Sequence, residues 1–343
     1  MLGNIFGNIK PVFIAEIGLN HNGDINTAEK MIGKAAESGA HAVKFQTFIP
    51  ELMNSPFTSS LMNGDAEPVK NYSIREFFRT FLFSKEQWLQ LKKKSEECGV
   101  VFFSAPFDSP SVDLLESIDI PLYKIASSEV TNPPLLKKIA STGKPVILST
   151  GMSTADEIST AISILEANGA GEIVLLHCVS LYPLDDSEAN LSRIVSLRER
   201  FSKPVGISDH SRDYASVMIA AALGAAVVEK HFKLDYNHEC PDKDVSLSPV
   251  QFREMVSAAV RGSLMAGDGK IEFYGREAET ARGAKRSLFA AKDLIAGGIL
   301  SETDVLCLRP GTGIPASAIY EFTGRKLKTD IKEGSILKPE YFL

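Results

Sequence analysis

The chain has 343 residues, 44% of them hydrophobic and 23% charged, which is typical of a globular protein with a large core. Its formal net charge is −6 and its lysines and arginines are dispersed, whereas nucleic-acid-binding proteins usually carry a basic stripe. No stretch approaches the roughly 18 uncharged apolar residues of a membrane span, and the first residues lack a signal-peptide pattern. The four cysteines show no paired spacing. We therefore expect a cytoplasmic protein that binds neither nucleic acid nor membranes.

Short apolar runs recur through the first two thirds of the chain. Their nearly continuous apolar character, without strict alternation, is typical of parallel strands that are covered on both faces. The runs are 12–18, 42–46, 100–106, 122–127, 145–150, 172–179, 204–210 and 226–232.

The segments between these runs predict helices at 27–37, 84–97, 153–167 and 214–223, each followed closely by a glycine. Strands that alternate with helices in this way predict an α/β protein with a closed (β/α)₈ TIM barrel. A doubly wound open sheet is the alternative, but it usually has a glycine-rich phosphate loop after its first strand, and none is present.

The C-terminal residues differ in character from the rest. A stretch rich in glycine and charge, 267–284, precedes short strand-like pieces separated by turn sequences such as Pro310-Gly311-Thr312-Gly313. We expect a barrel domain over 1–266, a linker over 267–284 and a small independent domain over 285–343.

Polar residues stand at the ends of all eight predicted strands. TIM barrels carry their chemistry at the carboxyl ends of the strands, and burying unpaired charges costs several kcal/mol, so these side chains predict a shared polar pocket. The candidates are Glu16, Lys44, Gln46, Ser104, Lys124, Ser127, Glu129, Ser149, His177, Ser208, Asp209, His210, Glu229, Lys230 and His231.

Two groups within this set indicate specific chemistry. His210 and His231 suit an open divalent-metal site, although two unrelated histidines are the alternative. Lys44 and Lys124, together with the strand-end serines, suit a phosphate and a carboxylate. Lys124 has a second interpretation, as the Schiff-base nucleophile of an aldolase.

Seven colinear motifs resemble the N-acetylneuraminate synthase family, and the tail 285–300 resembles its C-terminal SAF, or antifreeze-like, domain. The resemblance covers essentially the whole chain in the right order. The motifs are IAEIGLNHNGD (14–24), VKFQT (43–47), YKIASSE (123–129), ILSTGM (147–152), LLHCVSLYP (175–183), GISDHS (206–211) and EKHF (229–232).

The resemblance implies a TIM barrel joined to a SAF domain in a domain-swapped homodimer. It implies condensation of phosphoenolpyruvate with an open-chain N-acetylated amino sugar. N-acetylmannosamine is the first expectation, and a 2,4-diacetamido-trideoxyhexose leading to legionaminic or pseudaminic acid is the alternative. His210 and His231 match the family's Mn²⁺ or Mg²⁺ ligands.

The resemblance also assigns roles to individual side chains. Glu16 matches the glutamate proposed to act on the attacking water, and Arg309 matches an arginine that reaches the partner's active site. The positions that hold phosphoenolpyruvate are Lys44, Lys124, Ser127, Ser149 and Ser208, and those near the sugar are Gln46, Glu129, Tyr182 and Asp242.

Two residues depart from the family pattern. Ala105 replaces a threonine that some synthases have in the phosphoenolpyruvate pocket, so we expect Ser104 or a water molecule to substitute. Ser180 replaces an asparagine near the sugar. These changes leave the phosphoenolpyruvate chemistry intact and bear on the choice of sugar.

Overall fold

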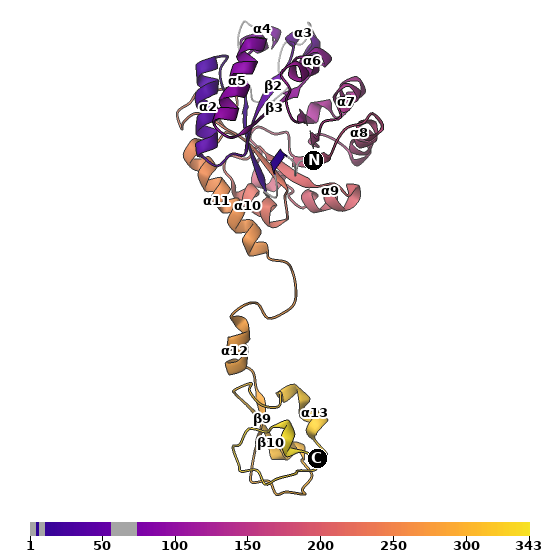
Figure 1. The fold of residues 1–343 in the computed structure, drawn as a ribbon, viewed down its shortest axis with the longest axis vertical. Coiled ribbons are helices and arrows are strands. Elements are labelled where there is room, and N and C mark those ends of the chain that lie inside the picture. Colours follow the sequence, from indigo (N-terminus) through magenta and orange to yellow (C-terminus); the bar gives the residue numbers. More distant parts are fainter. Residues whose placement is uncertain (1–4, 7–10, 56–73) are drawn as a thin grey trace. The chain divides into compact units, whose positions relative to one another are not determined.

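A computed structural model describes residues 5–6, 11–55 and 74–343 (Figure 1). The chain divides into two compact units, Met1–Gly267 and Asp268–Leu343. The segment 63–75, for which the sequence leaves sugar contacts unassigned, lies outside the described residues up to residue 73.

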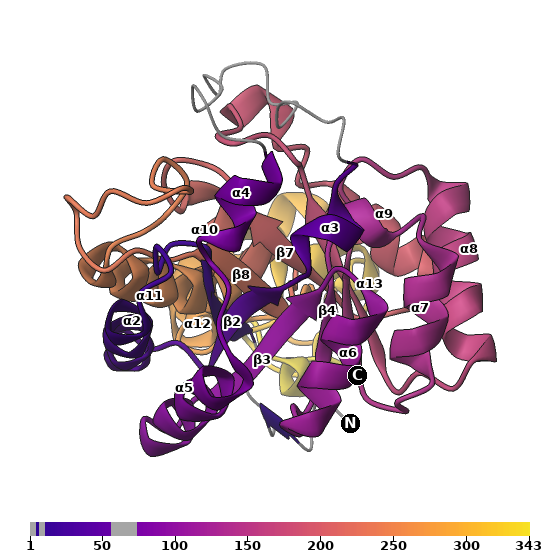
Figure 2. The same cartoon turned by 90° about the horizontal axis from the view of Figure 1, so that it is seen from above.

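The first unit is a closed barrel of eight parallel strands in sequential order, in which β8 pairs with β1. Figure 2 shows the helices surrounding the strands, so the expected TIM barrel is confirmed. The strands are β1 (Val12–Gly18), β2 (Ala42–Thr47), β3 (Val101–Pro106), β4 (Tyr123–Ile125), β5 (Val146–Ser149), β6 (Ile173–Cys178), β7 (Val205–Asp209) and β8 (Val227–His231).

Several helices of this unit begin at side-chain caps. Ser84 and Thr154 each form a reciprocal capping box with the residue three positions later, and Asp24 accepts two backbone N–H groups. The helices are α2 (Ile25–Glu37), α3 (Pro50–Met53), α4 (Ile74–Arg79), α5 (Lys85–Glu97), α6 (Ser109–Ser117), α7 (Pro133–Ala140), α8 (Ala155–Ala167), α9 (Arg193–Phe201), α10 (Ala215–Ala222) and α11 (Pro249–Ala266).

Most barrel strands contribute to two separate cores, because successive side chains point to opposite faces. The larger core lies between strands and helices and includes Phe13, Phe45 and Trp88. The smaller core fills the inside of the barrel and includes Ile14, Phe103 and Leu122. The inward positions nearer the carboxyl ends of the strands carry charged and polar side chains instead, among them Glu16 and Lys44.

The second unit holds α12 (Glu277–Ala284), an antiparallel pair of β9 (Ser287–Ala290) and β10 (Val305–Leu308), and α13 (Ile319–Phe322). Its own core includes Leu288, Leu300 and Leu337. Helix α12 falls within the stretch that the sequence interprets as a linker. Within the part of the chain that the structure describes, no helix is both long and apolar enough to cross a membrane.

Candidate active site

Two lysines and two glutamates form a buried charged cluster inside the carboxyl end of the barrel. Lys44 Nζ lies 2.8 Å from Glu16 Oε2 and 3.8 Å from Glu229 Oε1. Lys124 Nζ lies 3.6 Å from the same Glu229 oxygen, which also accepts a 2.9 Å hydrogen bond from Ser208 Oγ. All four charged side chains are at most 5% exposed. Four strands, β1, β2, β4 and β8, thus bring opposite charges together where water is scarce.

An irregularity in β1 positions the first of these carboxylates. The register with β2 shifts between Glu16 and Gly18, so two residues of β1 face one of β2. Gly18 adopts a φ of +51°, and a Cβ at this position would lie 2.9 Å from Glu16 Oε1 and 3.3 Å from Gln46 Nε2. Gln46 Nε2 donates to Glu16 Oε1 over 3.1 Å. A glycine is therefore required both by the backbone conformation and by the space that the Glu16 carboxylate occupies.

Burial and neighbouring charges act in opposite directions on these groups. Burial alone would lower the pKa of Lys44, but the carboxylates of Glu16 and Glu229 outweigh it and raise that pKa. Burial dominates at Lys124, whose pKa is lowered despite Glu229. Burial would raise the pKa of Glu229, but Lys124 and Lys44 hold it below its usual value. The cluster therefore contains an ionised carboxylate and two ammonium groups with different affinities for their protons.

His210 and His231 lie side by side next to this cluster, with ring centroids 5.3 Å apart. His210 Nδ1 lies 2.8 Å from the Val179 carbonyl, to which it donates in the tautomer that leaves Nε2 free as a donor to a metal. His231 Nδ1 lies 3.3 Å from Asp242 Oδ2 but has no well-aligned hydrogen bond. Tyr182 stacks on His210 with centroids 4.0 Å apart.

These side chains fit a divalent cation held by two imidazoles. Both rings are buried, and the Asp242 carboxylate adds negative charge beside them. No group of three or more His, Cys, Asp or Glu side chains among the described residues is arranged to hold a metal ion. His210 and His231 are the two side chains that could hold such an ion, with its remaining ligands supplied by substrate or water.

Known families match both units of the chain. Residues 31–271 match the NeuB family, and residues 285–342 match the SAF domain. The chain belongs to the NeuB family. It is 38% identical to N,N'-diacetyllegionaminic acid synthase from Campylobacter jejuni, over 96% of this chain and 99% of that one. Pseudaminic acid synthase from the same species is 35% identical, over 99% of both chains.

A solved structure supports the same assignment. The crystal structure of N-acetylneuraminic acid (sialic acid) synthetase from Leptospira borgpetersenii, in complex with citrate, is 36% identical with a TM-score of 0.72. The match covers 80% of this chain and 91% of that chain. The resemblance seen in the sequence motifs is thereby confirmed at the level of the family and the fold.

Other residues predicted for this NeuB-family site also lie at the carboxyl ends of the strands. Lys124 Nζ donates to Ser149 Oγ over 2.6 Å. Ser127 Oγ accepts from the Gly151 N–H over 3.0 Å. Glu129, one turn beyond β4, accepts from Asn132 Nδ2 over 2.7 Å. Arg309 belongs to the second unit, where its side chain is exposed.

Four strand-end residues do not join the cluster. Ser104 Oγ bonds to Thr47 Oγ1 at 2.7 Å, beside residues that pack against the outer helices. Asp209 and Lys230 pair with each other, and His177 Nε2 bonds to the Ala189 carbonyl. Each stands next to an inward-facing residue, so strand alternation turns it outward. Ser104 is therefore not placed to substitute for the missing threonine.

Two residues that the sequence reasoning passed over lie at this site. Cys178 Sγ is 3.9 Å from His210 Nδ1, and Asn20 bonds through its side chain to the Asp242 N–H, the Ser246 hydroxyl and the Phe232 carbonyl. Alternation along β6 places Cys178 on the inward face once His177 is outward. Asn20 had no comparable sequence indication beyond its place in the first motif, and it ties the loop that carries Asp242 to the loop after β1.

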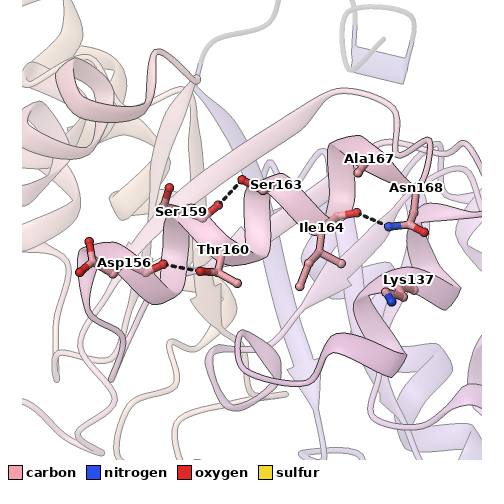
Figure 3. A pocket seen from close by; sticks show the side chains of 8 residues that line it. All are labelled: Lys137, Asp156, Ser159, Thr160, Ser163, Ile164, Ala167 and Asn168. Carbon is pink, nitrogen blue, oxygen red and sulfur yellow. Dashed lines mark hydrogen bonds between the residues drawn. The ribbon is translucent and has the colours of Figure 1, made fainter.

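A groove elsewhere on the barrel has no such chemistry. Figure 3 shows it along α8, with Lys137 of α7 at its side. Its polar lining groups already bond within their own helix: Thr160 to the Asp156 carbonyl, Ser163 to the Ser159 carbonyl and Asn168 to the Ile164 carbonyl. The candidate site is therefore the carboxyl end of the barrel and not this groove.

Proposed function

We propose that this protein is a nonulosonic acid synthase that condenses phosphoenolpyruvate with an open-chain N-acetylated amino sugar and water, releasing phosphate. The observation that carries the proposal is the buried pair of ammonium groups, Lys44 and Lys124, beside the two imidazoles of His210 and His231. Its support from the comparisons is that full-length relatives are synthases of this kind.

The two lysines supply the charge that a small dianionic or trianionic substrate requires. Phosphoenolpyruvate carries a phosphate and a carboxylate on three carbons, and Lys44 of β2 and Lys124 of β4 both contact Glu229. Ser127 and Ser149 add hydroxyl groups beside Lys124. Ionic hydrogen bonds of this kind are stronger than neutral ones and orient the substrate as well as bind it.

The reaction forms one carbon–carbon bond and one carbon–oxygen bond, to water, and breaks the carbon–oxygen bond to phosphate. Carbon 3 of phosphoenolpyruvate attacks the sugar aldehyde, whose oxygen gains a proton, and positive charge develops at carbon 2. Water adds to carbon 2, and the bond from carbon 2 to the phosphate oxygen breaks. We propose that Glu16, which contacts Lys44 and Gln46, orients that water and accepts its proton.

We further propose that His210 and His231 hold Mn²⁺ or Mg²⁺. When bound, the cation supplies Lewis-acid polarisation of the sugar aldehyde. The Val179 carbonyl fixes the ring of His210, and Tyr182 covers the same ring. Asp242 and Tyr182 lie beside the imidazoles, where they can contact a sugar drawn to the cation.

The acceptor sugar is N-acetylmannosamine or a 2,4-diacetamido-trideoxyhexose. The two Campylobacter relatives are synthases of legionaminic and pseudaminic acid, which supports the 2,4-diacetamido-trideoxyhexose. Ser180, in place of an asparagine, changes the part of the pocket that we expect near the sugar. Neutral changes in a pocket discriminate by only about 10–200-fold, so side-by-side kinetics must decide.

The oligomer and the compartment complete the proposal. We propose a homodimer in which Arg309 of the SAF domain reaches the partner's active site, as in the family, and a cytoplasmic location. The match of 285–342 to the SAF domain supports the homodimer. The four free cysteines support the cytoplasmic location, because thiols stay reduced there. A tail-deleted chain should fold but not turn over. Activity should return in mixed dimers with a Lys124→Met chain, whose own site is inactive but whose Arg309 is intact, and should not return with an Arg309→Ala chain.

The decisive assay is phosphate release from phosphoenolpyruvate with each candidate sugar, with and without EDTA. Phosphoenolpyruvate labelled with ¹⁸O at the bridging oxygen should transfer the label to phosphate, because the carbon–oxygen bond breaks. EDTA should abolish turnover, and Mn²⁺ or Mg²⁺ should restore it. Sugar-independent phosphate release, or label retained in the organic product, would contradict the proposal.

A Schiff-base aldolase is the second candidate, favoured by one observation. Burial lowers the pKa of Lys124, which makes its amine more nucleophilic. Borohydride with pyruvate would trap such an enzyme covalently at Lys124. We expect no trapping, since Lys124 is held by Ser149 and Glu229 in an ionic network suited to an anion.

A further inference from the structure

A second buried ion pair lies behind the two histidines, on the outer face of the barrel. Lys230 Nζ is 2.5 Å from Asp209 Oδ2, and the two side chains are 0% and 2% exposed. Asp209 also accepts hydrogen bonds from Ser216 Oγ of α10 and from Ser211 Oγ, at 2.6 Å and 2.7 Å. Its carboxylate is fully satisfied without any contact to the pocket.

Lys230 contacts the chain on both sides of His210. Its ammonium donates to the side chain of Asp209 and, over 2.5 Å, to the backbone carbonyl of Ser211. The backbone of Lys230 itself leads directly into His231. Asp209 and Lys230 form the last register pair between β7 and β8, so His210 lies just beyond this ladder, where its carbonyl accepts from the Leu184 N–H.

The two imidazoles differ in how they are held. His210 has a hydrogen bond of its own, to the Val179 carbonyl, whereas His231 Nδ1 has none of good geometry. The backbone of His231 is held by its pairing with β1 and by the Leu247 N–H. The position of His210 relative to it depends in addition on the link that Lys230 makes to Asp209 and Ser211. A buried ion pair contributes little net stability, because desolvation offsets its attraction, but it can select one arrangement over others.

We propose that Lys230 is a positioning residue: together with Asp209 it sets the spacing of His210 and His231, and so presets the divalent-cation site. The inference rests on the proposed function, since the cation is part of it. Lys230 touches neither cation nor substrate and acts only through the two histidines.

The test compares the wild-type protein with the double variant Asp209→Asn/Lys230→Met. The double variant removes both charges and leaves an amide whose oxygen can accept from one of the two serines, Ser211 or Ser216, and whose nitrogen can donate to the hydroxyl oxygen of the other. Its unfolding temperature should therefore stay close to that of the wild type. Its Kd for Mn²⁺, measured by calorimetry without substrates, should rise about 10–100-fold, and the electron paramagnetic resonance spectrum of bound Mn²⁺ should change.

A matched control is Glu116→Gln/Lys144→Met, which removes another ion pair of the barrel, 2.7 Å long, just before β5. It should bind Mn²⁺ as the wild type does. A double variant at 209 and 230 with unaltered Mn²⁺ affinity, in a wild-type background that binds the ion, overturns the positioning role and leaves the proposed function intact. A wild-type protein that binds no Mn²⁺ and ignores EDTA overturns both.

Discussion

The two ends of the barrel interior are built from the same eight strands yet have opposite chemistry. At the amino ends the inward side chains are apolar, as with Ile14, Phe103 and Leu122. One or two inward positions further along, β1, β2 and β4 carry Glu16, Lys44 and Lys124. Burial is nearly complete at both ends. The difference teaches that burial alone does not distinguish a structural core from an active site. Buried charged side chains that pair with one another indicate the active site.

This contrast predicts that substitutions at the two ends separate stability from activity. The apolar end gains from hydrophobic burial and close packing, so it should tolerate no cavity. The charged end gains little net stability from its ion pairs, so changes there should affect binding and turnover first.

The largest effect is expected for Lys124→Met. Removing this ammonium deprives a phosphate or carboxylate of its partner, so kcat/KM for phosphoenolpyruvate should fall about 100–1000-fold. Glu229 keeps Lys44 and Ser208 as partners, so the unfolding midpoint in urea should change little. Steady-state kinetics and urea titration measure the two quantities, and a variant with wild-type turnover would remove Lys124 from the site.

Phe103→Ala should show the opposite pattern. Its side chain is fully buried in the inner core, so the cavity should lower the free energy of unfolding by about 3–5 kcal/mol. Activity per folded molecule should be unchanged at temperatures where the variant remains folded. Phe103→Leu is the milder control. If Phe103→Ala and Phe103→Leu each lost turnover in proportion to their loss of stability, the apolar and charged ends of the barrel interior would be coupled.

His21 tests whether buried polarity outside the barrel interior contributes to the pH dependence of stability. Burial lowers its pKa to about 4, and its ring lies 4.5 Å from that of Phe83. Between about pH 6.5 and 4 the unfolded chain binds a proton at His21 that the folded chain does not. Stability should therefore fall by up to about 3 kcal/mol as the pH falls through this window. Unfolding of His21→Gln should show a flatter pH profile, and an identical slope in both proteins would contradict the assignment.

The smallest effect is expected for Gly18→Ala, at the boundary of the charged end. The positive φ should cost about 1–2 kcal/mol, and the added Cβ should displace Glu16 and lower kcat by about tenfold. Gly99→Ala is the matched control, because Gly99 also has a positive φ but open space around it. It should lose similar stability and no activity. Equal kcat values for the two variants would show that the Glu16 position does not depend on Gly18.

The sequence by itself determined the barrel and most of the site. Continuous apolar runs separated by capped helices predicted every strand of the barrel, because strands covered on both faces cannot alternate with polar residues. Lys44, Lys124 and Glu229 could be identified because each interrupts such a run near its carboxyl end. The same rule also selected Ser104, Asp209 and Lys230, which the structure turns outward.

Only the tertiary structure decided which of two successive polar residues at a strand end, such as Ser208 and Asp209, faces the barrel interior. The inward phase of a strand depends on how the barrel closes and on irregularities such as that between Glu16 and Gly18, which no single strand encodes. Contacts between distant segments were likewise beyond the sequence: Asp242 meets His231 across a loop that Asn20 holds. Side-chain direction is a property of the closed sheet, because strand pairing, and not local propensity, fixes the register.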